Sequence, residues 1–181
     1  MFKVGFYFQK YALNWYNKSM LIRKTTPEDL PRLLEIYESA RSFMAKSGNP
    51  AQWGNAWPPT SLLERDIQSG HSYACLHDRR VVGTFFFNFG KDIEPTYAVI
   101  IDGKWQNDGP YGVIHRLAGD GSVKGIGAYC INWCYEQCCH LRVDTHPDNQ
   151  VMQRLLTKLG FKRCGIIHVM QDNMPRIAFE K

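Results

Sequence analysis

The chain has 181 residues, of which 44% are hydrophobic and 22% charged, and its formal net charge is +5. This length suits one domain with a substantial buried core. No run of Lys or Arg is longer than two, and no apolar run approaches the roughly 20 residues of a membrane span. We therefore expect neither nucleic-acid nor membrane partners. The six cysteines do not look like a disulfide framework, which favours a reduced, cytoplasmic compartment.

The first 19 residues are aromatic and dotted with lysines, without the apolar core or cleavage site of a signal peptide. We expect an N-terminal appendage of uncertain structure over residues 1–19, followed by a single domain over residues 20–181.

The domain opens with a strand at 21–26 and a helix at 27–46, which begins with a Thr-Pro-Glu-Asp cap. A loop rich in Gly, Pro and Asn and a short helix at 60–70 follow. The segment 72–90 indicates a hairpin that turns near Asp78 and Arg79, and strands are predicted at 96–100 and 111–118.

The second half alternates strands with helices. Helices are predicted at 125–139 and 149–159, and strands at 141–145, 161–170 and 174–181. The first half is rich in strands, and strands and helices alternate in the second. Together these patterns indicate an α+β domain around a mixed central sheet.

The stretch GDGSVKGIGAYC, residues 119–130, is a glycine-rich turn between a strand and a helix. It does not fit the dinucleotide fingerprint, because Lys124 or Cys130 stands where the third glycine is needed. It does not fit the P-loop either, because Lys124 is followed by Gly125 and not by Ser or Thr. The free N–H groups at the helix start and the positive end of the helix dipole suit a pyrophosphate. A plain tight turn is the alternative.

The stretch RVDTHPDN, residues 142–149, sets polar residues between a strand and a helix. Catalytic and ligand-orienting groups often gather at such a strand end. We expect Asp148 to cap the following helix, whereas spacing does not separate capping from ligand binding for Asn149.

These motifs resemble the GNAT superfamily of N-acetyltransferases. The likeness lies in a strand ending HRLA, in VKGIGA opening a helix, and in Asn149 standing eleven residues before Gly160. It extends from about residue 21 to the end, and DTHPDN with the following MQ and KLGF is similar to a bacterial subgroup of mostly unassigned substrates.

The resemblance implies a mixed, mainly antiparallel sheet flanked by helices, whose two central parallel strands splay apart to form a coenzyme A cleft. It also implies that acetyl-CoA is the cosubstrate and a small-molecule or peptide primary amine the acceptor. The residues expected to bind acetyl-CoA are Leu117, Ala118, Gly119, Val123, Lys124, Gly125, Ile126, Gly127, Ala128 and Asn149. A homodimer stays an open alternative.

Two positions depart from the family pattern. Ser122 stands where a Gln or Arg is usual, and Lys124 offers a substitute charge. Leu156 stands where many members place the tyrosine that protonates the leaving thiolate. A catalytically weak acyl-CoA-binding or sensor module is therefore the alternative function, and an interaction domain with no acetyl-CoA chemistry is a second rival.

The general base is expected among the histidines, whose ordinary titration range suits neutral pH. His146 ends a strand beside Asp144, which we expect to orient it, so His146 ranks slightly ahead of His115. Regular alternation would place His115 with Leu117 on one strand face and turn it toward the core.

Four of the six cysteines lie in the helix predicted at 125–139, where they suit small buried hydrophobes better than disulfides or metal ligands. We expect no metal. An aromatic acceptor pocket and ordinary packing are equally consistent with the residues Trp53, Trp57, Tyr97, Trp105 and Tyr111.

Overall fold

The computed structural model describes residues 20–170 and 173–181, so the predicted appendage lies outside the described residues. Seven strands form one sheet in the order β1-β2-β3-β4-β5-β7-β6. They are β1 (Met20–Lys24), β2 (Ser72–His77), β3 (Arg80–Gly90), β4 (Tyr111–Gly119), β5 (Leu141–Thr145), β6 (Lys162–His168) and β7 (Pro175–Glu180). Strands β4 and β5 are parallel, whereas the other neighbours are antiparallel. The predicted mixed, mainly antiparallel sheet is confirmed.

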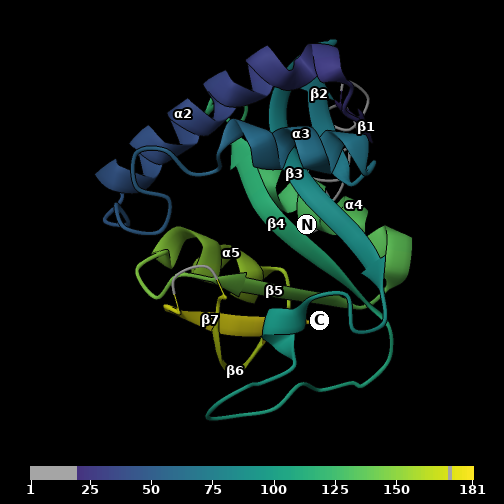
Figure 1. The fold of residues 1–181 in the computed structure, drawn as a ribbon, viewed down its shortest axis with the longest axis vertical. Coiled ribbons are helices and arrows are strands. Elements are labelled where there is room, and N and C mark those ends of the chain that lie inside the picture. The colour runs from purple at the N-terminus through teal and green to yellow at the C-terminus, as the bar shows by residue number, and fades with distance from the viewer. Residues whose placement is uncertain (1–19, 171–172) are drawn as a thin grey trace, which may run out of the picture.

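Helices cover both faces of the sheet (Figure 1). They are α2 (Leu30–Lys46), α3 (Thr60–Gln68), α4 (Ile126–Cys138) and α5 (Gln150–Lys158). Helix α2 follows a 3-10 turn, Pro27–Asp29, and the Asp29 carboxylate accepts the Thr26 N–H at 2.8 Å, as the predicted cap requires. The helices in the described part of the chain are too short or too polar to cross a bilayer.

The strand predicted at 96–100 is wrong. The segment instead begins with a 3-10 turn, Pro95–Tyr97, because the Glu94 carboxylate accepts the N–H and hydroxyl of Thr96. Beyond the turn, Ile101 makes a single antiparallel bridge to Ile166 of β6. The segment between β3 and β4 therefore folds back against the far end of the sheet.

Two hydrophobic clusters fix the helices to the sheet. On one face, Leu33 and Tyr37 of α2 and Leu63 of α3 pack over β2, β3 and β4. On the other face, the α4 cluster contains Cys130 and Cys134, both with no exposed surface, and burial raises the pKa of each thiol. These cysteines therefore serve as small core residues.

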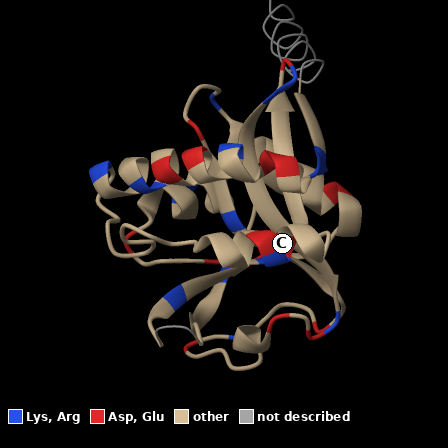
Figure 2. Cartoon of the chain, turned by 45° about the horizontal axis from the view of Figure 1, so that its top comes forward, with Lys and Arg blue, Asp and Glu red and all other residues tan. Residues whose placement is uncertain are grey.

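Among the described residues, no three His, Cys, Asp or Glu side chains gather closely enough to hold a metal ion. Helix α2 carries both acidic and basic residues along its length, as Figure 2 shows.

Candidate active site

Strands β4 and β5 form the predicted splayed pair. They pair at only two positions, Gly112 with Leu141 and Val113 with Arg142. The two arrows then diverge in Figure 1. Beyond Val113, no residue of β4 pairs with a residue of β5.

A bulge interrupts β4 just where the cleft opens. Phe86 pairs with His115 and Thr84 with Ala118, so that one residue of β3 faces two residues of β4. Arg116 has a φ of 54°, in the left-handed region that non-glycine residues rarely occupy. The bulge removes peptide groups near Leu117 from the regular ladder with β3.

The bulge interrupts the regular alternation of side chains along β4. His115 contacts the Phe86 ring at 5.8 Å between centroids, and the Arg116 guanidinium lies 4.7 Å from the centre of that ring, so both share one face. Leu117 packs with the α4 cluster on the opposite face. The expectation that His115 shares a face with Leu117 is therefore wrong, and its side chain is 23% exposed rather than in the core.

Two carboxylates flank the His115 ring. Nε2 lies 2.8 Å from Oε2 of Glu94, and Nδ1 lies 3.9 Å from Oδ1 of Asp144. Burial would raise the pKa of Glu94, but His115 and Thr96 outweigh it and lower that pKa to about 2. Because Glu94 is then ionised at neutral pH, Nε2 donates to it, and Nδ1 keeps a lone pair that can accept a proton.

Tyr97 completes this group. Its hydroxyl donates to Oδ1 of Asp144 at 2.8 Å, and its ring lies 6.4 Å from that of His115. Burial, reinforced by the Asp144 carboxylate, raises the pKa of Tyr97, so the phenol stays protonated as a donor. We call His115, Glu94, Asp144 and Tyr97 the histidine group.

His146 lies elsewhere in this arrangement. Asp144 contacts Tyr97 and His115 in place of the pairing with His146 that the sequence suggested. His146 is 7% exposed, and its Nδ1 accepts the Asp148 N–H at 3.2 Å. The same nitrogen lies 3.6 Å from Oδ2 of Asp148, so Nδ1 is turned toward the residues just before α5.

The glycine loop has the open shape that an anion needs. Gly125, the residue before α4, has a φ of 83°, and a Cβ added there would meet nothing within 4 Å. Asp120 fixes the start of the loop by accepting the N–H and hydroxyl of Ser122 and by pairing with Arg32. Open space beside the helix N-terminus fits the predicted pyrophosphate contacts of residues 123–128.

Gly127 has a packing role as well. A Cβ at this position would lie 3.0 Å from Leu155 of α5 and 3.9 Å from Leu117 of β4. Its missing side chain thus lets α4 approach α5 and the cleft strand closely.

Asn149, not Asp148, caps α5. Its Oδ1 accepts the Met152 N–H at 3.0 Å, while its Nδ2 donates to Gln52 Oε1 at 2.9 Å. The expected capping role of Asp148 is therefore wrong. The link to Gln52 joins α5 to the loop between α2 and α3, and no local sequence pattern indicates it.

The aromatic residues divide between site and scaffold. Trp105 and Tyr111 enclose the Arg142 guanidinium, each with its ring centre 4.3 Å away, so they stabilise the segment before β4. Trp53 packs edge-on against Tyr37 at 5.7 Å. Tyr97 belongs to the histidine group, and the Tyr111 hydroxyl accepts the Glu94 N–H at 3.4 Å.

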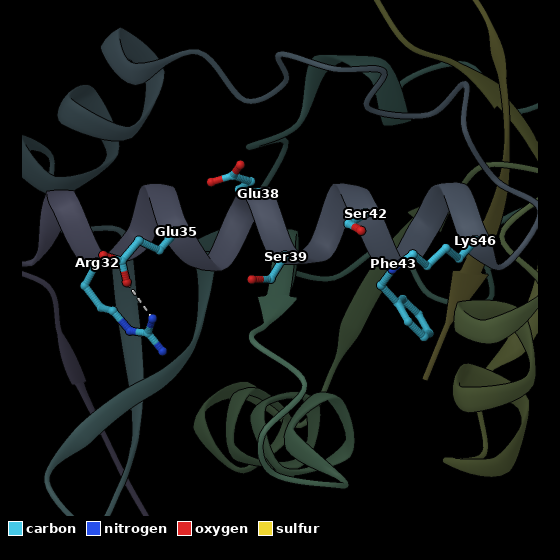
Figure 3. Close-up of a pocket in the computed structure, with 7 residues that line it drawn as sticks. All are labelled: Arg32, Glu35, Glu38, Ser39, Ser42, Phe43 and Lys46. Atoms are coloured by element: carbon cyan, nitrogen blue, oxygen red, sulfur yellow. Dashed lines mark hydrogen bonds and ion pairs between the residues drawn. The ribbon is translucent and has the colours of Figure 1, made fainter.

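A groove along α2 lies apart from the histidine group. It is lined by Arg32, Glu35, Glu38, Ser39, Ser42, Phe43 and Lys46, and Figure 3 shows Arg32 paired with Glu35. All seven residues belong to one helix, so the groove has no opposing wall that would hold a ligand.

Comparison with solved structures agrees with this fold. A GNAT-family acetyltransferase from Streptococcus agalactiae has a TM-score of 0.79 and 29% identity, over 90% of this chain and 94% of that one. A putative acetyltransferase from Staphylococcus aureus has a TM-score of 0.65 and 23% identity, over 89% and 97%. The putative acetyltransferase YncA of Salmonella typhimurium, solved with its cofactor acetyl-CoA, has a TM-score of 0.57 and 14% identity, over 90% and 93%.

No family model and no curated protein sequence matches the chain. The fold and these structural likenesses nevertheless support an acetyltransferase of the GNAT family. The resemblance drawn from the motifs is thereby confirmed.

Proposed function

We propose that the protein transfers an acetyl group from acetyl-CoA to a primary amine of a small molecule or peptide. The observation that carries the proposal is the pair β4 and β5, joined at only two positions and followed by a bulge beside His115. Acetyl-CoA supplies an activated thioester, and YncA, of similar fold, has been solved with it.

The cofactor side of the cleft fits coenzyme A. The amides of Val123 to Ala128 stand at the start of α4, where backbone N–H groups and the helix dipole favour a diphosphate. The left-handed Gly125 leaves room for it, and Lys124 is exposed beside the loop. Leu117, Ala118 and Gly119 provide a strand edge for pairing with the pantetheine amides.

The acceptor side supplies acid–base chemistry. An ammonium must lose a proton before it can attack, and in the proposed reaction Nδ1 of His115 receives that proton. Glu94 holds the ring from Nε2, while Asp144 stands near the nitrogen that becomes charged. N–H groups freed by the bulge near Ala118 would stabilise the negative oxygen that develops during attack. This assignment ranks His115 above His146.

The departing thiolate needs a proton, and Leu156 cannot supply it. Leu156 has no exposed surface and packs in the α4 cluster. In the proposed reaction the thiolate takes its proton from solvent or from the acetylated amine, which must lose one proton in any case.

A screen of amines with acetyl-CoA, measuring free thiol and the acetylated product, tests the proposal. We expect thiol release that depends on the amine and produces an equal amount of N-acetyl product. Tight acetyl-CoA binding in calorimetry without thiol release would instead favour the sensor module.

A further inference from the structure

Arg116 is held at both its side chain and its backbone. Its Nε and one terminal nitrogen donate to the Asp66 carboxylate of α3 at 2.9 and 2.8 Å. Its carbonyl accepts the Tyr37 hydroxyl of α2 at 3.1 Å, and its guanidinium lies over Phe86 of β3. Three elements far apart in sequence therefore converge on one bulge residue.

These contacts offset the conformational cost of the left-handed backbone at Arg116. A left-handed residue with a Cβ is disfavoured, and glycine is the usual occupant of such a bulge. Strained positions of this kind persist where the surroundings determine them, and they cluster at functional sites. Arginine is well suited to being held, because its planar guanidinium binds a carboxylate through two donors.

The clamp is also well buried. The side chains of Arg116 and Asp66 are 12% and 9% exposed, and Tyr37 is 2% exposed. Burial raises the pKa of Asp66, which Arg116 opposes. The bulge residue is thus fixed from within the α2/α3 layer, on the face opposite Leu117 and α4.

We propose that Asp66 and Tyr37 are positioning residues: by holding Arg116 in its left-handed conformation, they fix the backbone N–H groups that stabilise the oxyanion. The inference rests on the proposed acetyl transfer. Neither residue touches the reacting atoms. Both act on the rate through the conformation of β4.

Tyr37→Phe tests the carbonyl contact while keeping the ring in place. We expect kcat to fall about fivefold with little change in the KM for acetyl-CoA, since a donor aimed at the oxyanion acts mainly in the transition state. The matched control is Tyr129→Phe, which removes a tyrosine hydrogen bond to the Met20 carbonyl at 3.2 Å, away from the bulge. Equal kcat values for the two variants would overturn the role of Tyr37.

A second pair of variants separates backbone conformation from loss of charge. In an Asp66→Asn background, Arg116→Gly and Arg116→Ala both lack the guanidinium, but only glycine occupies the left-handed region without cost. We expect kcat to be roughly tenfold higher for the glycine variant. An alanine variant that is equal or faster would contradict the clamp, because side-chain chemistry is the same in both.

The failure of this inference can be told apart from failure of the proposed function. Hydrogen exchange at the amides of 116–118 needs no turnover, and we expect faster exchange in the alanine variant than in the glycine variant. If the parent releases no thiol with any amine, acetyl transfer is wrong while exchange still tests the clamp. If the parent is active and both exchange and kcat match between the variants, the clamp is wrong.

Discussion

The two sides of the candidate site, the glycine loop and the histidine group, are built in different ways. The glycine loop is continuous in sequence, residues 119–128, and offers backbone amides in open space. The histidine group brings together side chains from β4, β5 and the segment between β3 and β4, and partner side chains fix each one. One side depends on the shape of a single turn, whereas the other depends on long-range packing.

This difference predicts different responses to substitution. Altering the loop should change affinity for acetyl-CoA and leave the proton chemistry intact. Altering the histidine group should change the rate and its pH dependence and leave acetyl-CoA affinity intact.

The largest effect is expected for His115→Ala. Loss of a general base typically lowers the rate by about a hundredfold to ten-thousandfold. We expect kcat/KM to fall by a factor in this range, and the remaining activity no longer to decline as the pH is lowered. Acetyl-CoA affinity, measured by calorimetry, should stay near that of the parent.

Two further histidine variants complete that measurement. His168→Ala removes an exposed histidine on β6 and should behave as the parent. His146→Ala should lower the melting temperature, because His146 is buried, with the shape of the pH profile retained. If His146→Ala abolishes the acid decline and His115→Ala does not, the order of the two histidines must be reversed.

Gly125→Asn tests the loop side. Asparagine tolerates a left-handed backbone better than most residues, so its side chain would fill the space beside α4 with limited strain. We expect acetyl-CoA to bind about ten- to a hundredfold more weakly, as when charge-assisted hydrogen bonds are lost. Gly121→Asn is the matched control, since Gly121 also has a positive φ and open space but precedes the predicted cradle. Equal weakening in both variants would mean that the loop's general conformation, not the cradle, governs affinity.

The turn and the helix of the glycine loop could be predicted from local signals, whereas its role as an anion site stays a prediction. Glycines between an apolar strand and a helix indicate an anion site without knowledge of the rest of the fold. The splay of β4 and β5 followed from a family resemblance carried by the same short motifs, and the structure confirms it.

The contacts within the histidine group could not be predicted from the sequence, for a physical reason. Glu94 is 21 residues before His115, in a segment without strand or helix periodicity, and contacts it only after folding. The left-handed residue of the bulge is Arg116 and not a glycine, so the sequence does not indicate the bulge. The assumption of regular alternation therefore predicted the wrong face for His115. Asp144 and His146 are neighbours in sequence, but Tyr97 and His115 compete for Asp144 in the folded chain.

Glu94→Gln is expected to change how the free energy of unfolding depends on pH. Because the folded pKa of Glu94 is about 2, below its ordinary value of 4.5, its contribution is complete above pH 4.5 and is lost as pH falls toward 2. In chemical denaturation, the parent should lose on the order of 2 kcal/mol more than the variant across this window. Glu38→Gln, at an exposed position of α2, is the control and should follow the parent. Coinciding curves for parent and Glu94→Gln would show that the pair with His115 contributes little.

The smallest effect is expected for Leu156→Tyr, which places the family's usual acid at its usual position. Leu156 has no exposed surface and packs among residues of the α4 cluster, so a larger side chain with a hydroxyl must displace its neighbours. Overpacking of this kind typically costs about 1–3 kcal/mol, or roughly 5 °C in melting temperature for a chain of this size.

Leu156→Met, which conserves volume, should melt close to the parent. We expect kcat for Leu156→Tyr at low temperature to match that of Leu156→Met, because proton delivery to the thiolate in this chain does not pass through position 156. A several-fold rise in kcat specific to the tyrosine variant would show that the cleft does reach position 156 and that thiolate protonation limits the parent. In that event the rate of turnover in this chain would be limited by a missing acid and not by the placement of His115.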